Sequence, residues 1–174
     1  MATLVLTVIG DDRSGLVSAL SGVIADHGGS WERSQMARLA GKFAGIVLVA
    51  VPDESAEALI AELGPLGSQG LLDVTVERGA DEVPASSDLT RLTLELVGAD
   101  RPGIVHDISQ ALAARAVSIE ELHTATREAP MVGGMLFEAT AILLAPPSVP
   151  IAELQTVLEE LANELMVDIA LSAQ

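Results

Sequence analysis

Two short stretches of the chain carry the residue types best suited to bind a small charged ligand. Residues 10–17 read Gly-Asp-Asp-Arg-Ser-Gly-Leu-Val, and residues 98–105 read Gly-Ala-Asp-Arg-Pro-Gly-Ile-Val. Each stretch follows an apolar run and precedes a helical pattern, which predicts a turn between a strand and a helix. Function is therefore expected at these two turns.

The chemistry of such a turn suits a ligand with two opposite charges. A glycine at the start of a helix lets a ligand approach the backbone, because no Cβ stands in the way. The first N–H groups of a helix have no partner within it, and with the helix dipole they attract an anion. The amides after Gly15 and Gly103 could bind a carboxylate, while Asp12 or Asp100 could neutralise a cationic group. A free amino acid carries both groups.

The same residues could also have purely structural roles. Asp12 and Asp100 are suited to cap a helix or to stabilise a turn. Arg13 and Arg101 could form surface ion pairs, and Pro102 fits the start of a helix. Neither turn has the glycine pattern that nucleotide phosphates need.

The two turns belong to a longer internal repeat. The first half from Leu4 aligns without a gap with the second half from Leu92, and the alignment pairs Ser30 with Ser118. Such a duplication indicates two domains. We predict a first domain at residues 1–79, an acidic linker at residues 80–88 and a second domain at residues 89–174.

Each half shows the same order of predicted elements. The patterns indicate strand, helix, two strands, helix and strand, which is the βαββαβ order of a ferredoxin-like unit. The predicted strands cover residues 3–9, 30–39, 43–51, 71–76, 89–97, 118–126, 135–144 and 167–171. The predicted helices cover residues 16–24, 52–63, 104–114 and 151–165. The fold class is therefore α+β, with two ferredoxin-like domains packed as a tandem pair.

Composition excludes several function classes. A net charge of −16 repels nucleic acid, so no direct DNA or RNA binding is expected. The chain has no cysteine, and its longest apolar run, residues 46–51, is much shorter than the roughly 20 residues of a membrane span. No signal peptide is indicated. We predict a cytoplasmic protein that does not bind membranes.

No catalytic or metal site can be assembled from the sequence. The three histidines are His27, His106 and His123, and none is paired at the spacing of metal ligands. No set of nucleophile, base and orienting residue is found. The sequence therefore predicts no catalytic residues, no metal and no cofactor.

The motifs resemble those of a known family. The βαββαβ order with Asp-Arg-x-Gly-[Leu/Ile]-Val at the first turn resembles the ACT domain, a sensing module that commonly binds amino acids. Two such domains, with Ala-Pro-Met-Val-Gly-Gly-Met-Leu-Phe at residues 129–137, resemble the tandem-ACT group called glycine cleavage system transcriptional repressor. The resemblance implies a ligand where domains meet, with the turn of one domain facing the second strand of its neighbour.

The resemblance also implies particular ligand-binding residues. The positions that match the family's turn are Asp12, Arg13, Gly15, Leu16, Asp100, Arg101, Pro102, Gly103 and Ile104. ACT domains often have Asn at the start of the second strand, where this chain has Ser30 and Ser118. A serine offers one hydroxyl instead of an amide, so the ligand contacts there must differ.

These observations lead to two hypotheses. The first is a non-catalytic regulator that senses an amino acid at the domain interface and modulates a partner protein. The alternative is a structural dimerisation module without a ligand. A homodimer is expected under both, because exposed sheet edges can pair between chains. The second turn is favoured as the ligand site because it has the rigid Pro102 and a longer neighbouring hairpin loop, residues 127–134.

Overall fold

The computed structural model describes residues 1–79, 88–131 and 133–173. They form two compact units, which are separated by residues 80–87. The predicted linker, residues 80–88, therefore lies outside the described residues except for Asp88.

Both units have the predicted element order. The first unit contains β1 (Ala2–Asp11), α1 (Leu16–Asp26), β2 (Ser30–Leu39), β3 (Lys42–Val51), the 3-10 turn η1 (Asp53–Ser55), α2 (Ala56–Ser68) and β4 (Asp73–Arg78). The second unit contains β5 (Thr90–Ala99), α3 (Ile104–Ala113), β6 (Ser118–Glu128), β7 (Met135–Ala145), α4 (Ile151–Leu165) and β8 (Val167–Ala173). The α+β class and the βαββαβ order are confirmed.

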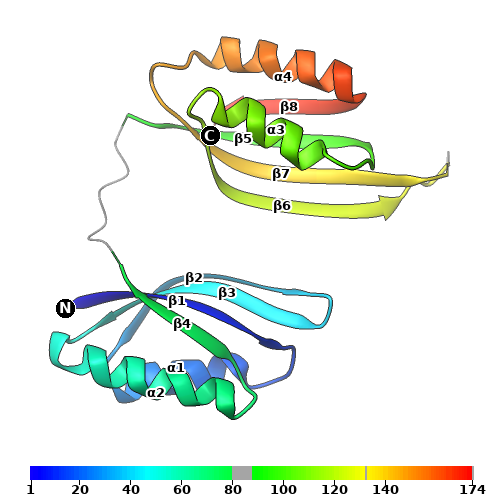
Figure 1. Ribbon diagram of the computed structural model, residues 1–174. Helices are drawn as coiled ribbons and strands as arrows, with labels where there is room; N and C mark the ends of the chain where they lie inside the picture. Colours follow the sequence, from blue (N-terminus) through cyan, green and yellow to red (C-terminus); the bar gives the residue numbers. More distant parts are fainter. Residues whose placement is uncertain (80–87, 132, 174) are drawn as a thin grey trace. The chain divides into compact units, whose positions relative to one another are not determined.

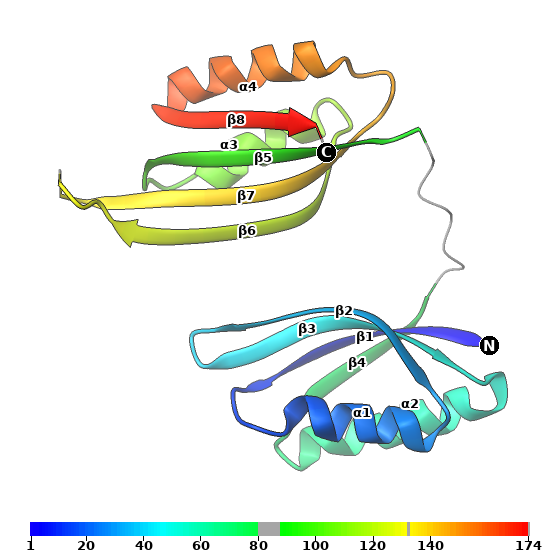
Figure 2. The ribbon, with the colours of Figure 1, turned by 180° about the vertical axis from the view of Figure 1, so that it is seen from behind.

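Each unit is one sheet with two helices on one of its faces. The first sheet is four-stranded, with the order β2-β3-β1-β4, and the second has the matching order β6-β7-β5-β8. All neighbouring strands are antiparallel. Figures 1 and 2 show α1 and α2 covering one face of the first sheet, and α3 and α4 covering one face of the second.

An aliphatic core fills the space between helices and sheet in each unit. Alternate residues of β1 face the helices, so Leu4, Leu6 and Val8 are buried. On α1, Leu20 and Ile24 meet them at helical spacing. The second core repeats this arrangement with Leu92, Leu94, Leu96, Ile108 and Leu112. Because this spacing is repeated in both halves of the chain, the two turns lie at the same point of each unit.

Several elements extend beyond their predicted ends. The strands β1 and β5 continue to Asp11 and Ala99, so the first two residues of each predicted turn belong to a strand. The helix predicted to stop near residue 63 continues to Ser68, past Pro65. Leu66 lies in the first core and is only 5% exposed, so its burial holds this extra turn in helical form. On β6 the strand continues to Glu128, where the Arg127 side chain pairs with Glu138 at 2.6 Å. Arg127 and Glu128 therefore belong to the hairpin strand rather than to its loop.

Candidate functional site

Both turns end in a glycine with a left-handed backbone. Gly15 has φ 90° and Gly103 has φ 94°, and each is the residue that precedes the first turn of its helix. Residues with a Cβ rarely adopt this conformation, so glycine is required at both positions. The backbone explains why the two glycines recur in the sequence.

The helix ends beyond these glycines keep free N–H groups. No side chain caps α1 or α3 within the described part of the chain. The first helical hydrogen bonds are those from Ala19 N–H to Gly15 O and from Asp107 N–H to Gly103 O, both 2.9 Å long. Neither Asp12 nor Asp100 therefore caps a helix. The N–H groups between Gly15 and Ala19, and between Gly103 and Asp107, remain available to an anion.

A hydrogen bond from the neighbouring hairpin fixes each turn. Asp12 N–H donates to Gly41 O at 2.9 Å in the first unit, and Asp100 N–H donates to Met135 O at 2.8 Å in the second. The turn backbone is thus held in the same way in both units.

In the first turn, every charged side chain is already bound by the protein. The Asp12 carboxylate pairs with Arg38 at 3.1 Å, and Asp11 pairs with Lys42. The hydrogen bond from the Lys42 ammonium, together with its charge, lowers the pKa of Asp11. Arg13 donates from Nη2 to the carbonyl oxygen of Gly70 at 2.5 Å, just beyond the end of α2.

The first turn also forms a pocket of about 210 Å³. Four predicted site residues line it together: Asp12, Arg13, Gly15 and Leu16. Val17, Ser18 and Phe43 complete the lining and were not predicted. The repeat pairs Phe43 with Phe137, which was a signal that this aromatic residue matters in both units.

The second turn lacks the basic partners of the first. Where the first unit has Arg38 and Lys42, the alignment places Thr126 and Leu136 in the second. The Asp100 carboxylate makes no hydrogen bond or ion pair with any residue that the structure describes. Asp100 is thus a free acceptor in the same turn as the unpaired N–H groups of α3.

Some of the other predicted residues of the second turn are exposed to solvent, and one is buried in the core. Pro102 and Gly103 are exposed in the turn, whereas Ile104 points into the core and is 2% exposed. Arg101 lies 3.8 Å from Asp107 and lines a groove of about 630 Å³ between α3 and α4. Arg101 is therefore engaged on the helix side of the turn.

The two predicted serines lie far from the turn of their own unit. Ser30 pairs with Ala50, which pairs with Thr3 of β1, whereas the turn begins after Asp11. The eight residue steps from Thr3 to Asp11 correspond to about 26 Å of strand. Ser118 has the equivalent register in the second sheet. Neither unit brings its serine to its own turn.

Other kinds of site find little support among the described residues. No buried polar or charged side chain occurs in that part of the chain. No group of three potential metal ligands is found there either. No described helix is long and apolar enough to span a membrane.

Fold and turn together define a tandem of ferredoxin-like domains, each with a glycine-ended turn suited to an anionic group. The chain belongs to the ACT domain family, whose model matches residues 2–77 and 90–172. The family predicted from the turn motifs is confirmed.

Solved structures show the same tandem fold over nearly the whole chain. A protein of unknown function from Galdieria sulphuraria is 30% identical with a TM-score of 0.82, covering 99% of this chain and 98% of that one. A "putative glycine cleavage system transcriptional repressor" is 18% identical with a TM-score of 0.74, covering 99% of this chain and 97% of that one. No curated protein matches the chain.

Proposed function

We propose that the chain is a non-catalytic regulatory protein that binds a free amino acid and modulates a partner protein. The observation that carries this proposal is the free carboxylate of Asp100 in the turn that leads to the uncapped α3. One charged group of each sign on the ligand would find its complement in this single turn.

The ligand carboxylate would accept hydrogen bonds from the free N–H groups that follow Gly103. The ligand ammonium would pair with Asp100, and a charge-assisted pair of this kind is stronger than a neutral hydrogen bond. The first turn offers the same N–H groups, but its Asp12 is already paired with Arg38. We therefore assign the principal site to the second turn.

A second ACT domain would complete the site. In ACT domains the turn of one domain faces the second strand of another, and Ser30 and Ser118 both begin such a strand. Each serine lies about 26 Å from its own turn along the strand, so it would serve the turn of another domain.

In this proposal the chain regulates by contact with a partner protein rather than by contact with DNA. The structural similarity to a protein named as a repressor suggests transcriptional regulation. A net charge of −16 opposes direct contact with DNA, because DNA affinity depends on Lys and Arg. We propose a protein partner in the cytoplasm that recognises one ligand state of the tandem.

Calorimetric titration with each of the twenty amino acids tests the proposal. At least one should bind to the wild-type chain, and Asp100→Asn should weaken that binding by about tenfold or more, because it removes the partner of the ammonium. Asp12→Asn is the matched control and should leave the affinity nearly unchanged. If no amino acid binds, or if Asp100→Asn binds as tightly as the wild type, the proposal is wrong.

The alternative function, a dimerisation module without a ligand, is favoured by the open sheet edges. β2 and β4 are the edge strands of the first sheet, and β6 and β8 are those of the second. Light scattering with and without the bound amino acid distinguishes the two functions. If the protein is a homodimer whose mass is unchanged by every amino acid, and if its melting temperature in thermal unfolding is unchanged as well, the structural module is indicated.

A further inference from the structure

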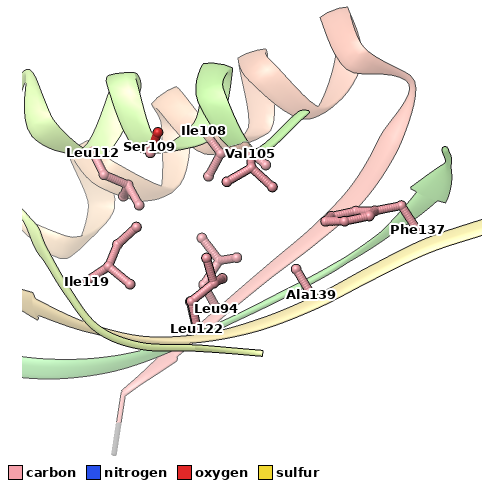
Figure 3. Close-up of a pocket in the computed structure, with 10 residues that line it drawn as sticks. Leu94, Val105, Ile108, Ser109, Leu112, Ile119, Leu122, Phe137 and Ala139 are labelled. Carbon is pink, nitrogen blue, oxygen red and sulfur yellow. The ribbon is translucent and has the colours of Figure 1, made fainter. Parts of the chain in front are cut away.

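A small apolar cavity lies in the second unit beneath α3. Figure 3 shows side chains of α3 facing those of the sheet across this cavity, with Phe137 at one end. The volume is about 20 Å³, and nine of the ten lining residues are apolar. The tenth, Ser109, already uses its hydroxyl to donate to His106 O at 3.0 Å. The cavity therefore offers a ligand no free polar partner.

The cavity borders the turn that contains Asp100. Val105, the second residue of α3, lines the cavity and also carries one of the free N–H groups at the helix start. Phe137 lines it as well and pairs with Gly98, two residues before Asp100. In the first unit the equivalent residues, Val17 and Phe43, line the turn pocket beside Asp12. A ligand held at the second turn is thus close to the cavity.

The residues around the cavity differ between the two units. At two lining positions the second unit has the smaller side chain, since Ile119 corresponds to Trp31 and Ala141 corresponds to Val47. At two others it has the larger one, since Leu122 corresponds to Ser34 and Ala139 corresponds to Gly45. This set of apolar lining residues therefore occurs only in the second of the two units.

We infer that this cavity receives the side chain of the amino acid bound at the second turn, and that this side chain is small and aliphatic, as in alanine or valine. The inference rests on the function proposed above and names the ligand class of that site. A volume of about 20 Å³ exceeds the roughly 10–15 Å³ that one water-sized sphere occupies, so one methyl group fits, such as that of alanine or one of the two of valine. A charged or hydroxylated side chain would lose its hydrogen bonds to water without replacement.

The affinities of a graded series of amino acids for the full chain test the inference. Calorimetry should show affinity rising from glycine through alanine to valine. Threonine has the shape of valine with a hydroxyl in place of one methyl, and it should bind about tenfold or more weakly than valine. Aspartate, lysine and phenylalanine should bind more weakly still, because the first two bury a charge and the third is too large.

A cavity-filling variant gives the second arm of the test. Ala141→Val adds two methyl groups to the cavity wall opposite Leu122, and the melting temperature of the variant checks that it folds. The substitution should weaken valine binding by about tenfold and leave glycine binding unchanged, because only valine needs the filled volume. Ala125→Val is the matched control, since Ala125 is an exposed residue of β6 that does not line the cavity.

The possible outcomes separate this inference from the proposed function. Equal affinity for valine and threonine, or an Ala141→Val variant that binds valine as the wild type does, would overturn the inference while leaving amino-acid binding established. If no amino acid binds to the wild-type chain, the proposed function fails, and the inference fails with it.

Discussion

The turn of the first unit and the turn of the second have the same backbone but use their charged side chains differently. Both contain a left-handed glycine before an uncapped helix. In the first, Asp12 is bound by Arg38 and Arg13 is bound by the carbonyl of Gly70. In the second, Asp100 is free and Arg101 faces the α3–α4 groove.

This difference shows where the chemistry of a duplicated turn is decided. The turn motif itself has hardly changed, since the Asp-Arg pair and the second glycine are present in both copies. The partners have changed on the neighbouring hairpin, where Thr126 stands in place of Arg38. A charge that stabilises the fold in one unit is thus left available for a ligand in the other.

The largest expected effect concerns the glycine near the end of the strand that precedes each turn, Gly10 in β1 and Gly98 in β5. A Cβ on Gly10 would stand 2.3 Å from the backbone oxygen of Leu71. A Cβ on Gly98 would stand 2.3 Å from Cγ1 and 2.8 Å from Cβ of Val167, whose backbone Cα is also only 3.0 Å away. Neither clash can be relieved by turning the end of a flexible side chain, so Gly10→Ala and Gly98→Ala should each destabilise their own unit by about 2–3 kcal/mol.

Urea unfolding can assign these losses to the two units. Trp31 is the only tryptophan and the chain has no tyrosine, so its fluorescence reports the first unit, while circular dichroism reports both. Gly22→Ala is the control, because a Cβ there meets nothing within 4 Å, and it should be neutral or stabilising. A loss below about 1 kcal/mol for either Gly10→Ala or Gly98→Ala would contradict the prediction.

The next effect comes from making the second turn resemble the first. Thr126 pairs with Phe137 in the same register as Arg38 pairs with Phe43. Thr126→Arg should therefore bring a guanidinium to Asp100 and weaken amino-acid binding by about tenfold, or roughly 1.4 kcal/mol. Thr124→Arg, on the same strand, serves as a control for added charge. Calorimetry that finds the same loss in both variants would refute the specific pairing.

A smaller effect is expected from the two arginines. Arg13→Met removes a hydrogen bond to a backbone carbonyl and should cost the first unit about 1 kcal/mol. Arg101→Met breaks only the exposed 3.8 Å contact with Asp107, so a loss below about 0.5 kcal/mol is expected. Unfolding midpoints by the same two optical signals measure both, and the reverse order would show that Arg101 has a structural partner in solution.

The smallest effect is a pH dependence confined to the first turn. The Lys42 ammonium lowers the pKa of Asp11, so the pair stabilises the folded chain above the usual pKa of an aspartate, and this contribution is lost as pH falls below about 4. Lys42→Met should raise the pKa of Asp11 toward its usual value, as an NMR titration of the carboxyl carbon can measure. The second turn has Ala99 at this position and should show no such dependence. An Asp11 titration unaffected by Lys42→Met would disprove the pairing.

Local patterns were sufficient to predict most of the fold. The period-two runs of β1 and β5 and the helical spacing of Leu20 and Ile24 placed the strands and helices, because both periodicities are properties of neighbouring residues. The end of α2 was missed, since the burial of Leu66 outweighs the cost of Pro65. Burial of this kind depends on residues distant in the chain.

The candidate site was only partly predictable for the same reason. The sequence identified the turns, and the first pocket does bring together Asp12, Arg13, Gly15 and Leu16. The sequence did not identify Phe43 as a lining residue. The distance from Ser30 to its own turn also follows from strand pairing, which the turn motif does not encode.

The sequence by itself determined the duplication, the ACT fold, the aliphatic cores and the two glycine-ended turns. These features follow from residue periodicity and from backbone conformations that only glycine readily adopts. Only the tertiary structure decided that Asp12 is bound while Asp100 is free, and that a cavity remains under α3. Both depend on the pairing of each hairpin with the first strand of its unit, β3 with β1 and β7 with β5, because this pairing places the hairpin side chains beside the turn and the helix. These pairings join residues far apart in the chain.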